Sequence, residues 1–295
     1  MARPDDKDGW HDVPRQDGRR FVVTGASGGL GAETVRVLAD RGAHVVLAVR
    51  NVEKGERVAA TIDGEVEVRT LDVADLASVR SFADELGPVD VLINNAGVLA
   101  LPFGLSPDGV EMHFATNHLG HFALTNLLLP RLGDRVVVVG SAAHRRGEID
   151  VTDLQWERRG YQPFAAYAAS KLANLLFLAE LQRRLTAMGS TLRATGAHPG
   201  STATQITANT GSRLKTLVGE FGHKLVGMAA WQGALPTLYA ATMDVPGNSY
   251  LGPHRIREMS GWPTGVGRSR AAIDPDLAKA LWTESERLSG VQFPF

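Results

Sequence analysis

TGASGGLG at residues 24–31 decides the fold of this chain. A short apolar run precedes these glycines, and a helical pattern follows them as far as Asp40. Gly25 permits a tight turn, Gly29 removes a side chain where a phosphate would approach the backbone, and Gly31 lets the helix pack closely. Free N–H groups at the start of that helix suit a pyrophosphate. The stretch therefore predicts a nucleotide-binding turn between a strand and a helix.

Apolar runs of strand length alternate with helical patterns along the rest of the chain. Strands are predicted at residues 20–24, 44–49, 65–70, 89–93, 135–140, 191–197 and 249–252. Helices are predicted at 31–40, 52–62, 75–86, 108–129, 164–188, 227–243 and 274–289. The strands are rich in valine rather than alternating, as expected for strands buried on both faces. The predicted fold is α/β, a doubly wound parallel sheet with helices on both faces.

The chain is expected to form one domain over residues 19–295, because no linker or repeat divides it. Residues 1–18 are predicted to be a flexible N-terminal arm. The least regular segments, 142–163 and 200–227, each follow a strand. Both are therefore expected at the carboxyl edge of the sheet, where such folds bind ligands, and 200–227 is the predicted substrate loop.

Composition excludes several classes of function. The 31 Lys+Arg nearly balance the 32 Asp+Glu, which argues against a nucleic-acid binder. The chain has no cysteine, so a disulfide scaffold, a thiol nucleophile and a thiolate metal site are excluded. The longest strongly apolar stretches fall far short of the roughly 20 residues that span a bilayer. No secretory signal is readable at the N-terminus.

Six further motifs accompany the glycine stretch. They are Leu71-Asp72-Val73, NNAG at 94–97, Asn117 within a helix, Ser141 after the fifth strand, Tyr167-x-x-x-Lys171, and Pro199-Gly200. In this combination the chain resembles the short-chain dehydrogenase/reductase family over almost its whole length. TNHLGHF (116–122) and SKLANLLF (170–177) are similar to its retinol-dehydrogenase-like branch. The resemblance implies a Rossmann-type domain that transfers hydride between a nicotinamide cofactor and a carbonyl or an alcohol.

Four residues receive catalytic roles from this resemblance. Tyr167 would donate a proton to a carbonyl, or remove one from an alcohol, while Ser141 holds the same oxygen. Lys171 would bind the nicotinamide ribose, and Asn117 would hold a water that connects Lys171 to solvent. The spacing supports the pair, because residues four apart share one helix face and an ammonium lowers the pKa of a nearby phenol from about 10.

The end of the second strand favours NADP(H) over NAD(H). Val49 stands where NAD enzymes usually carry an acid for the ribose 2′-hydroxyl, and the Arg50 guanidinium can grip a 2′-phosphate. Gly28 weakens this preference, because NADP members often carry a basic residue there. Asp72 resembles the residue that meets the adenine, with a turn or cap role as the alternative. The predicted cofactor-binding residues are Gly25, Ser27, Gly28, Gly29, Leu30, Gly31, Arg50, Asn51, Asp72, Val73, Asn95, Ala96, Gly97, Tyr167, Lys171, Pro199, Gly200, Thr202 and Thr204.

The substrate is expected to be a lipophilic small molecule. An apolar pocket would be roofed, with ordinary packing as the alternative, by Trp156, Tyr161, Phe164, Leu214, Leu217, Val218 and Phe221. The chain lacks the apolar N-terminal anchor of membrane-bound relatives, which predicts a cytoplasmic protein. In the resembled family the helix that carries Tyr167 often pairs with its copy, so a homodimer or homotetramer is expected.

Other interpretations stay open beside this one. His118 and His121 share a helix face, but no carboxylate completes a metal site, so no metal is predicted. A light-dependent protochlorophyllide-reductase-like enzyme also uses a Tyr–Lys pair, although the missing cysteines count against it. A non-catalytic NADP(H) sensor on the same fold would typically lack that pair. Turnover of any carbonyl would exclude the sensor.

Overall fold

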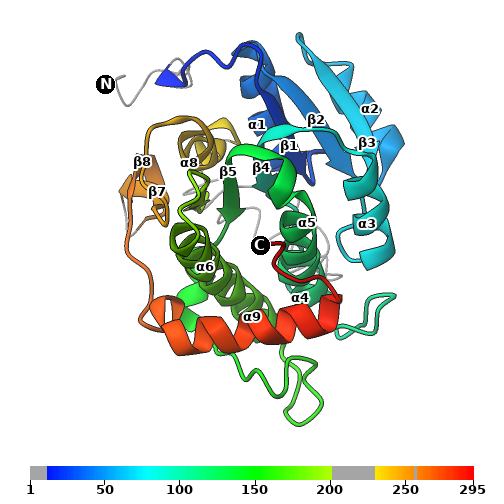
Figure 1. Ribbon diagram of the computed structural model, residues 1–295, viewed down its shortest axis with the longest axis vertical. Coiled ribbons are helices and arrows are strands. Elements are labelled where there is room, and N and C mark those ends of the chain that lie inside the picture. The colour runs from blue at the N-terminus through cyan, green and yellow to red at the C-terminus, as the bar shows by residue number, and fades with distance from the viewer. Residues whose placement is uncertain (1–11, 201–229, 256–257) are drawn as a thin grey trace, which may run out of the picture.

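The computed structural model of the protein describes residues 12–200, 230–255 and 258–295. One eight-stranded sheet, in the order β3-β2-β1-β4-β5-β6-β7-β8, runs through the domain (Figure 1). All neighbours pair in parallel except β7 and β8, which are antiparallel. The strands are β1 (Arg20–Thr24), β2 (His44–Val49), β3 (Val66–Thr70), β4 (Val89–Asn94), β5 (Leu132–Val139), β6 (Arg193–Ala197), β7 (Tyr250–Arg255) and β8 (Ser260–Gly265).

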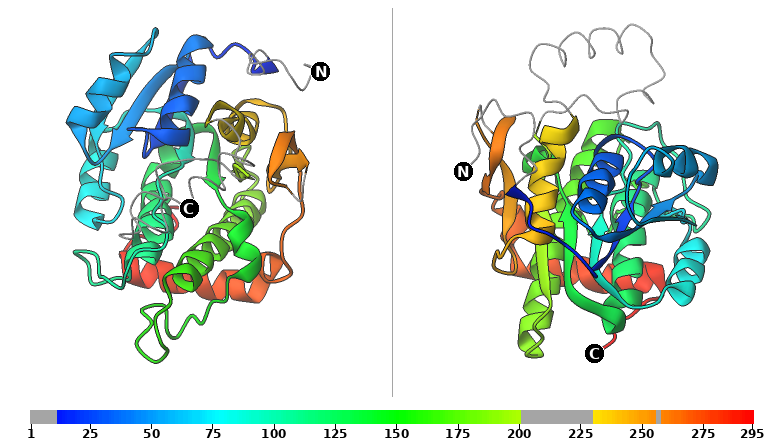
Figure 2. Two further views of the ribbon diagram at one scale, coloured as in Figure 1. Left: turned by 180° about the vertical axis from the view of Figure 1, so that it is seen from behind. Right: turned by 90° about the horizontal axis from the view of Figure 1, so that it is seen from above.

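Helices cover both faces of the sheet, as predicted. The longer ones are α1 (Gly29–Asp40), α2 (Val52–Ala59), α3 (Leu76–Glu85), α5 (Gly120–Leu128), α6 (Pro163–Ala187), α8 (Ala230–Thr242) and α9 (Pro275–Ser289). Alternate residues of each strand point to opposite faces: Val23 and Val45 pack with α1 and α8, whereas Val22 and Val46 pack with α3 and α5. Valine-rich strands are thus buried on both sides. Figure 2 shows α9 lying across α6 on the second face.

Two parts of the chain differ from the sequence-based elements. The helix predicted at 108–129 begins only at α4 (Met112–Phe114), passes through a π-helical segment, η2 (Ala115–Leu119), and continues as α5. Gly120 explains the close packing here, because a Cβ on it would lie 1.8 Å from the carbonyl oxygen of Val73. Strand β8 was not predicted, since its sequence SGWPTG contains the glycine and proline that strands usually avoid.

The described part of the expected N-terminal arm, residues 12–18, packs against the domain. Val13 and Gln16 are buried, and the Gln16 N–H donates to the carbonyl of Arg41 at 2.7 Å. Helix α6 is long and apolar enough to cross a membrane, contrary to the expectation from the apolar stretches alone. However, 78% of its most apolar window is buried inside the domain, as in the core helix of a globular protein.

Candidate active site

Parallel pairing brings the ends of four strands to one edge of the sheet. Val23 pairs with Ile93 near the ends of β1 and β4, Asn94 pairs with Val138, and Val139 pairs with Ala197. The segments that follow these strands carry the glycine stretch, NNAG, Ser141 and Pro199-Gly200. The edge predicted from the sequence to bind ligands therefore gathers the motifs into one site.

The glycine stretch forms a tight turn that only glycine can occupy at two positions. Gly25 has a φ of +68°, and a Cβ on it would lie 2.8 Å from the Cα of Ala96. A Cβ on Gly31 would lie 2.6 Å from the carbonyl oxygen of Gly25. Contacts this short do not occur in folded proteins, so Gly31 is needed for packing of the helix against this turn. Gly29, at a φ of +56°, also adopts the left-handed conformation that favours glycine.

The start of α1 is open to a ligand. Helices α2, α3 and α9 begin with Asn51, Asp75 and Asp274, whose side chains accept hydrogen bonds from the first turn. Helix α1 begins after Gly28, which offers no side-chain cap. Its first N–H groups can therefore bind an anion, and the positive end of the helix dipole favours one. These residues fit a pyrophosphate.

Thr24 and His121 join this turn to the helix that carries Asn117. The Thr24 hydroxyl accepts from the backbone N–H groups of Asn95 and Ala96, both at 2.9 Å. Its own proton is therefore available to Nε2 of His121, also at 2.9 Å. Nδ1–H of His121 then donates to the carbonyl of Asn117 at 3.1 Å. The sequence analysis missed Thr24 and weighed His121 only as a metal ligand, because the two residues are 97 positions apart.

The four predicted catalytic residues converge beside NNAG. A Cβ on Gly97 would lie 3.2 Å from Oδ1 of Asn117 and 3.6 Å from Nζ of Lys171, so both side chains face this backbone. Nζ of Lys171 donates to the carbonyl of Val139 at 3.1 Å, two residues before Ser141. The Asn117 amide donates to Oγ of Ser170 at 2.8 Å. Ser170 in turn donates to the carbonyl of Tyr167 at 2.7 Å, which links Asn117 to the tyrosine.

Burial shifts the pKa values of the tyrosine and the lysine in opposite directions. Burial raises the pKa of Tyr167 above its ordinary value, although hydrogen bonding with the Ser141 side chain lowers it in part. Burial lowers the pKa of Lys171 to about 8. In the chain alone burial therefore outweighs the lowering of the Tyr167 pKa expected from Lys171. Ser141 also accepts from the N–H of Ala143 at 3.1 Å, capping a short 3-10 helix, η4 (Ala142–Arg146).

The residues predicted to bind the adenosine end lie at the ends of β2 and β3. Arg50 is 77% exposed, and its guanidinium lies 3.9 Å from the Asp72 carboxylate, too far for a hydrogen bond. Oδ1 of Asp72 accepts from the N–H of Ala74 at 3.0 Å, so the turn role foreseen for it is real. Asn51 accepts from the N–H of Lys54 at 2.8 Å. The Arg50 guanidinium is thus accessible beside a carboxylate that is already engaged.

The nicotinamide side of the predicted site is described in part. Gly200 has a φ of +69°, and its N–H donates to Nδ1 of the buried His198 at 3.3 Å. This contact lies in the turn after β6, and no sequence motif predicted it. Thr202, Thr204 and the substrate loop beyond Gly200, as far as residue 229, lie outside the described residues. Among the residues that the structure describes, no three His, Asp or Glu side chains form a group suited to a metal ion.

Comparisons with known proteins agree with the motifs. The family model for short chain dehydrogenase matches residues 19–215. Retinol dehydrogenase 13 of Homo sapiens is 40% identical over 301 residues, covering 94% of this chain and 86% of that protein. Polyprenol dehydrogenase of Mus musculus is 40% identical over 296 residues, with the same coverages of 94% and 86%.

Two solved structures extend the comparison. An uncharacterized protein from Mycobacterium paratuberculosis has 51% sequence identity and a TM-score of 0.84, covering 97% of this chain and 98% of that one. A structure from Beutenbergia cavernae, described as an NAD(P)-dependent gluconate 5-dehydrogenase with bound NADP, has 25% identity and a TM-score of 0.60. It covers 77% of this chain and 91% of its own.

Proposed function

Because the chain belongs to the short-chain dehydrogenase family, we propose that it transfers hydride between NADP(H), in preference to NAD(H), and a lipophilic carbonyl compound or alcohol. It is an oxidoreductase that acts on CH–OH or C=O groups with NAD(P). One observation carries the proposal. Asn117 and Lys171 both face Gly97, and Ser170 links Asn117 to the carbonyl of Tyr167, beside Ser141, at the edge where α1 begins without a cap.

The chain offers binding groups along the whole cofactor. The uncapped N–H groups of residues 28–31 would hold the pyrophosphate, and Arg50 would hold the 2′-phosphate. Lys171 would hold the nicotinamide ribose, with Pro199 and Gly200 beside the ring. When bound, the cofactor supplies or accepts the hydride at nicotinamide C4.

The raised pKa of Tyr167 suits it to the role of proton donor. At neutral pH its phenol is protonated, so it can donate to the oxygen of a carbonyl as that oxygen gains charge. Ser141, whose side chain interacts with Tyr167, would hold the same oxygen. Oxidation of an alcohol needs the phenolate instead, which an ammonium close to the ring would stabilise. In the chain alone Tyr167 is therefore in the protonated state that a donor to a carbonyl oxygen requires.

Exposed apolar side chains near Tyr167 support a lipophilic substrate. Phe103 is 52% and Phe164 48% exposed, and Leu105 is similarly open to solvent. The Phe164 ring lies 6.1 Å from that of Tyr167, and Phe103 packs edge-on against Tyr161 at 5.2 Å. Exposed aromatic side chains around a catalytic group typically mark a binding surface. Retinol and polyprenol, named for two relatives, are both apolar alcohols.

A turnover screen tests the activity. Purified protein is mixed with NADPH and decanal, cyclic ketones, quinones or steroid ketones, and the corresponding alcohols are tried with NADP⁺. We expect turnover of apolar carbonyls, and a loss of at least about 10²-fold in Tyr167→Phe with NADPH affinity retained, since general acid catalysis contributes that much. Turnover confined to small charged acids would refute the lipophilic substrate. Tight NADPH binding without turnover of any carbonyl would favour the sensor.

Arg50→Ala tests the cofactor preference. A charge-assisted contact to a 2′-phosphate contributes about 1–3 kcal/mol, so the Kd of NADPH should rise about 5- to 150-fold while that of NADH stays nearly constant. Arg57→Ala, at an exposed arginine of α2, is the matched control. Equal losses for both cofactors would contradict the role of Arg50. Cytoplasmic location and assembly into a homodimer or homotetramer stay predictions from the sequence.

A further inference from the structure

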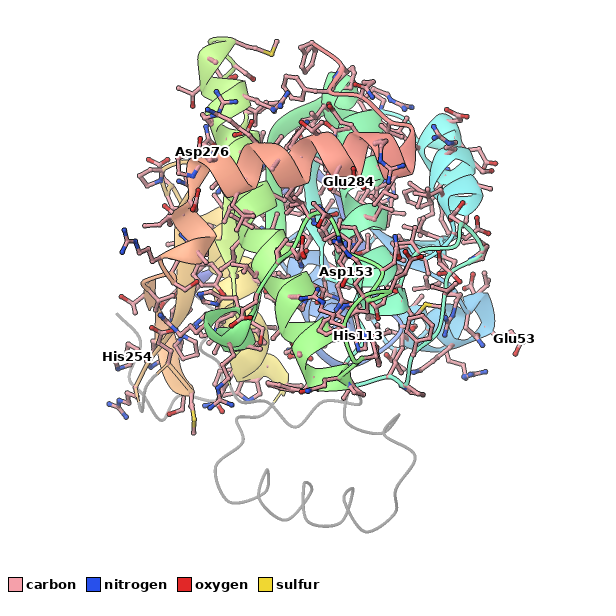
Figure 3. All side chains as sticks on the ribbon, turned by 90° about the horizontal axis from the view of Figure 1, so that it is seen from below. Glu53, His113, Asp153, His254, Asp276 and Glu284 are labelled. Atoms are coloured by element: carbon pink, nitrogen blue, oxygen red, sulfur yellow. The ribbon has the colours of Figure 1, made fainter. Side chains whose placement is uncertain are left out.

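A buried polar cluster, formed by Glu111, His113 and Tyr161, lies beside Tyr167 and outside the predicted catalytic residues. Glu111 is 1% exposed and His113 0%. In Figure 3 His113 is labelled near the middle of the view, whereas His254 and Glu53 lie at its margin. Burying a carboxylate and an imidazole is costly unless both are fully hydrogen-bonded. Glu111 and His113 therefore need hydrogen-bond partners inside the domain.

The Glu111 carboxylate is completely satisfied as an acceptor. Oε1 accepts from the backbone N–H of His113 at 3.0 Å and from its ring Nδ1–H at 2.9 Å, and the Tyr161 hydroxyl lies 3.0 Å away. Oε2 accepts from the N–H of Phe114 at 2.8 Å. Burial alone would raise the pKa of Glu111. The hydrogen bonds from His113 and Phe114 together outweigh this effect, so the pKa lies below its ordinary value. The group is an ionised acceptor.

The remaining bonds fix the protons on the other two members. The N–H of Leu101 donates to Nε2 of His113 at 3.1 Å, so the ring proton must sit on Nδ1 and point to Glu111. Nδ1 then cannot accept from the Tyr161 hydroxyl, although the two atoms are 3.0 Å apart. Tyr161 therefore donates to Glu111 or to the carbonyl of Leu101, at 3.1 Å. Burial raises the pKa of Tyr161, and the Glu111 charge adds to this, so it remains a donor.

These bonds join three segments that surround Tyr167. Leu101 belongs to the segment after β4, His113 to α4, and Tyr161 to the long segment before α6. The His113 ring lies 6.4 Å from the Tyr167 ring at 65°. Trp156 packs on Tyr161 at 5.6 Å, so the cluster also anchors aromatic side chains near the site.

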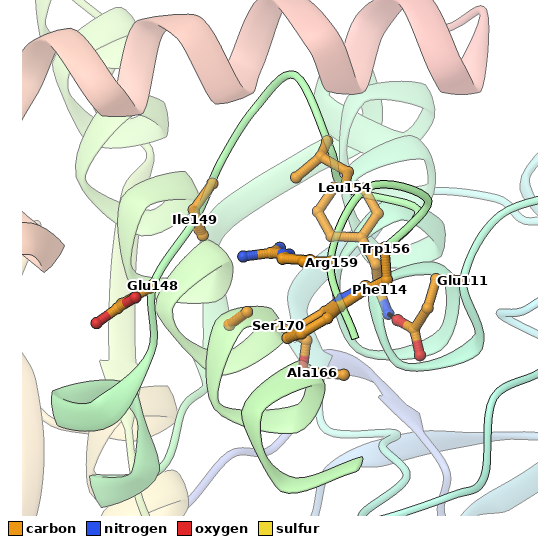
Figure 4. Close-up of a pocket in the computed structure, with 10 residues that line it drawn as sticks. Glu111, Phe114, Glu148, Ile149, Leu154, Trp156, Arg159, Ala166 and Ser170 are labelled. Carbon is orange, nitrogen blue, oxygen red and sulfur yellow. Dashed lines mark hydrogen bonds between the residues drawn. The ribbon is translucent and has the colours of Figure 1, made fainter. Parts of the chain in front are cut away.

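The region behind the cluster is tightly filled. Figure 4 shows a cavity beside Glu111, lined also by Phe114, Trp156, Arg159 and Ser170 among others. Its volume is about 10 Å³, room for about one water. The Arg159 guanidinium stacks 3.8 Å from the Trp156 ring and closes this side. The wall formed by the three segments has little space to move into.

We propose that Glu111, His113 and Tyr161 are positioning residues. They hold the acceptor-side wall, which is formed by the three segments that contain Leu101, His113 and Tyr161 and faces the carbonyl substrate, and they orient the Tyr167 ring. The inference rests on the proposed function, because such a wall matters only if an acceptor binds beside Tyr167. Binding sites work best when a second layer of hydrogen bonds holds the contacting groups in place. The cluster should therefore govern acceptor binding and proton transfer, and leave cofactor binding at the glycine turn unchanged.

Tyr161→Phe removes one hydroxyl and keeps the ring that packs on Phe103 and Trp156. With decanal and NADPH we expect the KM for decanal to rise at least 5-fold, while kcat and the Kd of NADPH change less than 2-fold. Tyr239→Phe is the matched control, because its hydroxyl bonds to Asp12 at 3.2 Å, away from the cluster. A Tyr161→Phe variant whose KM for decanal matches that of Tyr239→Phe would overturn the role of Tyr161 in the wall.

Two His113 substitutions separate the ring from its hydrogen bonds. His113→Asn keeps a donor for Glu111 but removes the ring beside Tyr167, and we expect kcat to fall at least 10-fold with the Kd of NADPH unchanged. His113→Phe keeps a ring there, so its kcat should fall less. A fall in kcat no larger in His113→Asn than in His113→Phe would overturn the orientation of Tyr167 by this ring.

Hydrogen exchange tests the cluster without turnover. In the NADPH-bound protein, the Leu101 amide should exchange at least 10-fold faster in His113→Phe than in wild type, because its acceptor is lost. An unchanged rate would overturn the cluster. Absence of wild-type turnover would instead count against the proposed function, and the exchange result would still decide whether the cluster holds the wall.

Discussion

Replacing Lys171 by Met should stabilise the protein in a pH-dependent way while removing its activity. Lys171 is only 5% exposed, and burial lowers the pKa of its ammonium from 10.5 to about 8. Below pH 8 both the folded and the unfolded chain carry the proton, so the full cost of burying the charge opposes folding. Between pH 8 and 10.5 only the unfolded chain is protonated, so the stability of the wild type rises with pH.

The size of this effect follows from the two pKa values. Linkage gives a gain of about 2–3 kcal/mol for the wild type between pH 7 and pH 10, which Lys171→Met lacks. Urea unfolding of both proteins without cofactor at pH 7, 8, 9 and 10 measures the difference. Lys279→Met, at an exposed lysine of α9, controls for loss of a charge. Parallel stability curves for wild type and Lys171→Met would refute the assignment of a buried ammonium to this position.

Two further substitutions test the packing and the buried histidines. Gly120→Ala should destabilise the fold by about 2–3 kcal/mol, because its Cβ would overlap the Val73 carbonyl. Urea unfolding measures this loss. Gly104→Ala is the control and should cost less, because no atom lies within 4 Å of its Cβ. Burial lowers the pKa of His118 to about 3 and that of His121 to about 4, so the unfolded chain takes up their protons first as pH falls below 6.5. As the pH falls further, the free energy of unfolding decreases by about 1.4 kcal/mol per pH unit for each histidine. His118→Phe should therefore reduce the slope of stability against pH by about 1.4 kcal/mol per pH unit between pH 6 and 4.5. A slope equal to that of wild type would contradict neutral burial of His118.

The fold could be predicted because its signals are local. Valine runs of strand length, helical periods and the glycine turn each lie within about a dozen residues, and together they predict the parallel sheet. Strand β8 could not be predicted, because its pairing with β7, Gly252 with Thr264 for example, holds a segment with weak strand propensity. The π-helical segment was also hidden, since it depends on how closely Gly120 approaches a distant carbonyl.

The candidate site divides in the same way. Tyr167 and Lys171 could be predicted from their spacing of four residues, and the glycine turn from its sequence pattern. Their electrostatics do not follow from spacing, because burial raises the pKa of Tyr167 and nothing in the local sequence measures burial. A motif thus identifies which groups meet, while the surrounding packing determines their protonation.

The histidines show where sequence reasoning stops. His113, His118 and His121 look alike in the sequence, as polar residues on an apolar helix. In the structure each has a different partner: His113 bonds to Glu111 and Leu101, His118 lies 2.9 Å from Oγ of Ser285, and His121 bonds to Thr24 and Asn117. Because two of these partners are 97 and 167 positions away, only the fold can assign the roles. His118 holds α9 against the core. His121 contacts the glycine turn on one side of the site, and His113 contacts the acceptor-side wall on the other. One helical segment therefore contacts both the cofactor side and the acceptor side of the site. A substitution in this segment is best judged by whether the affinity for the cofactor or for the carbonyl substrate falls.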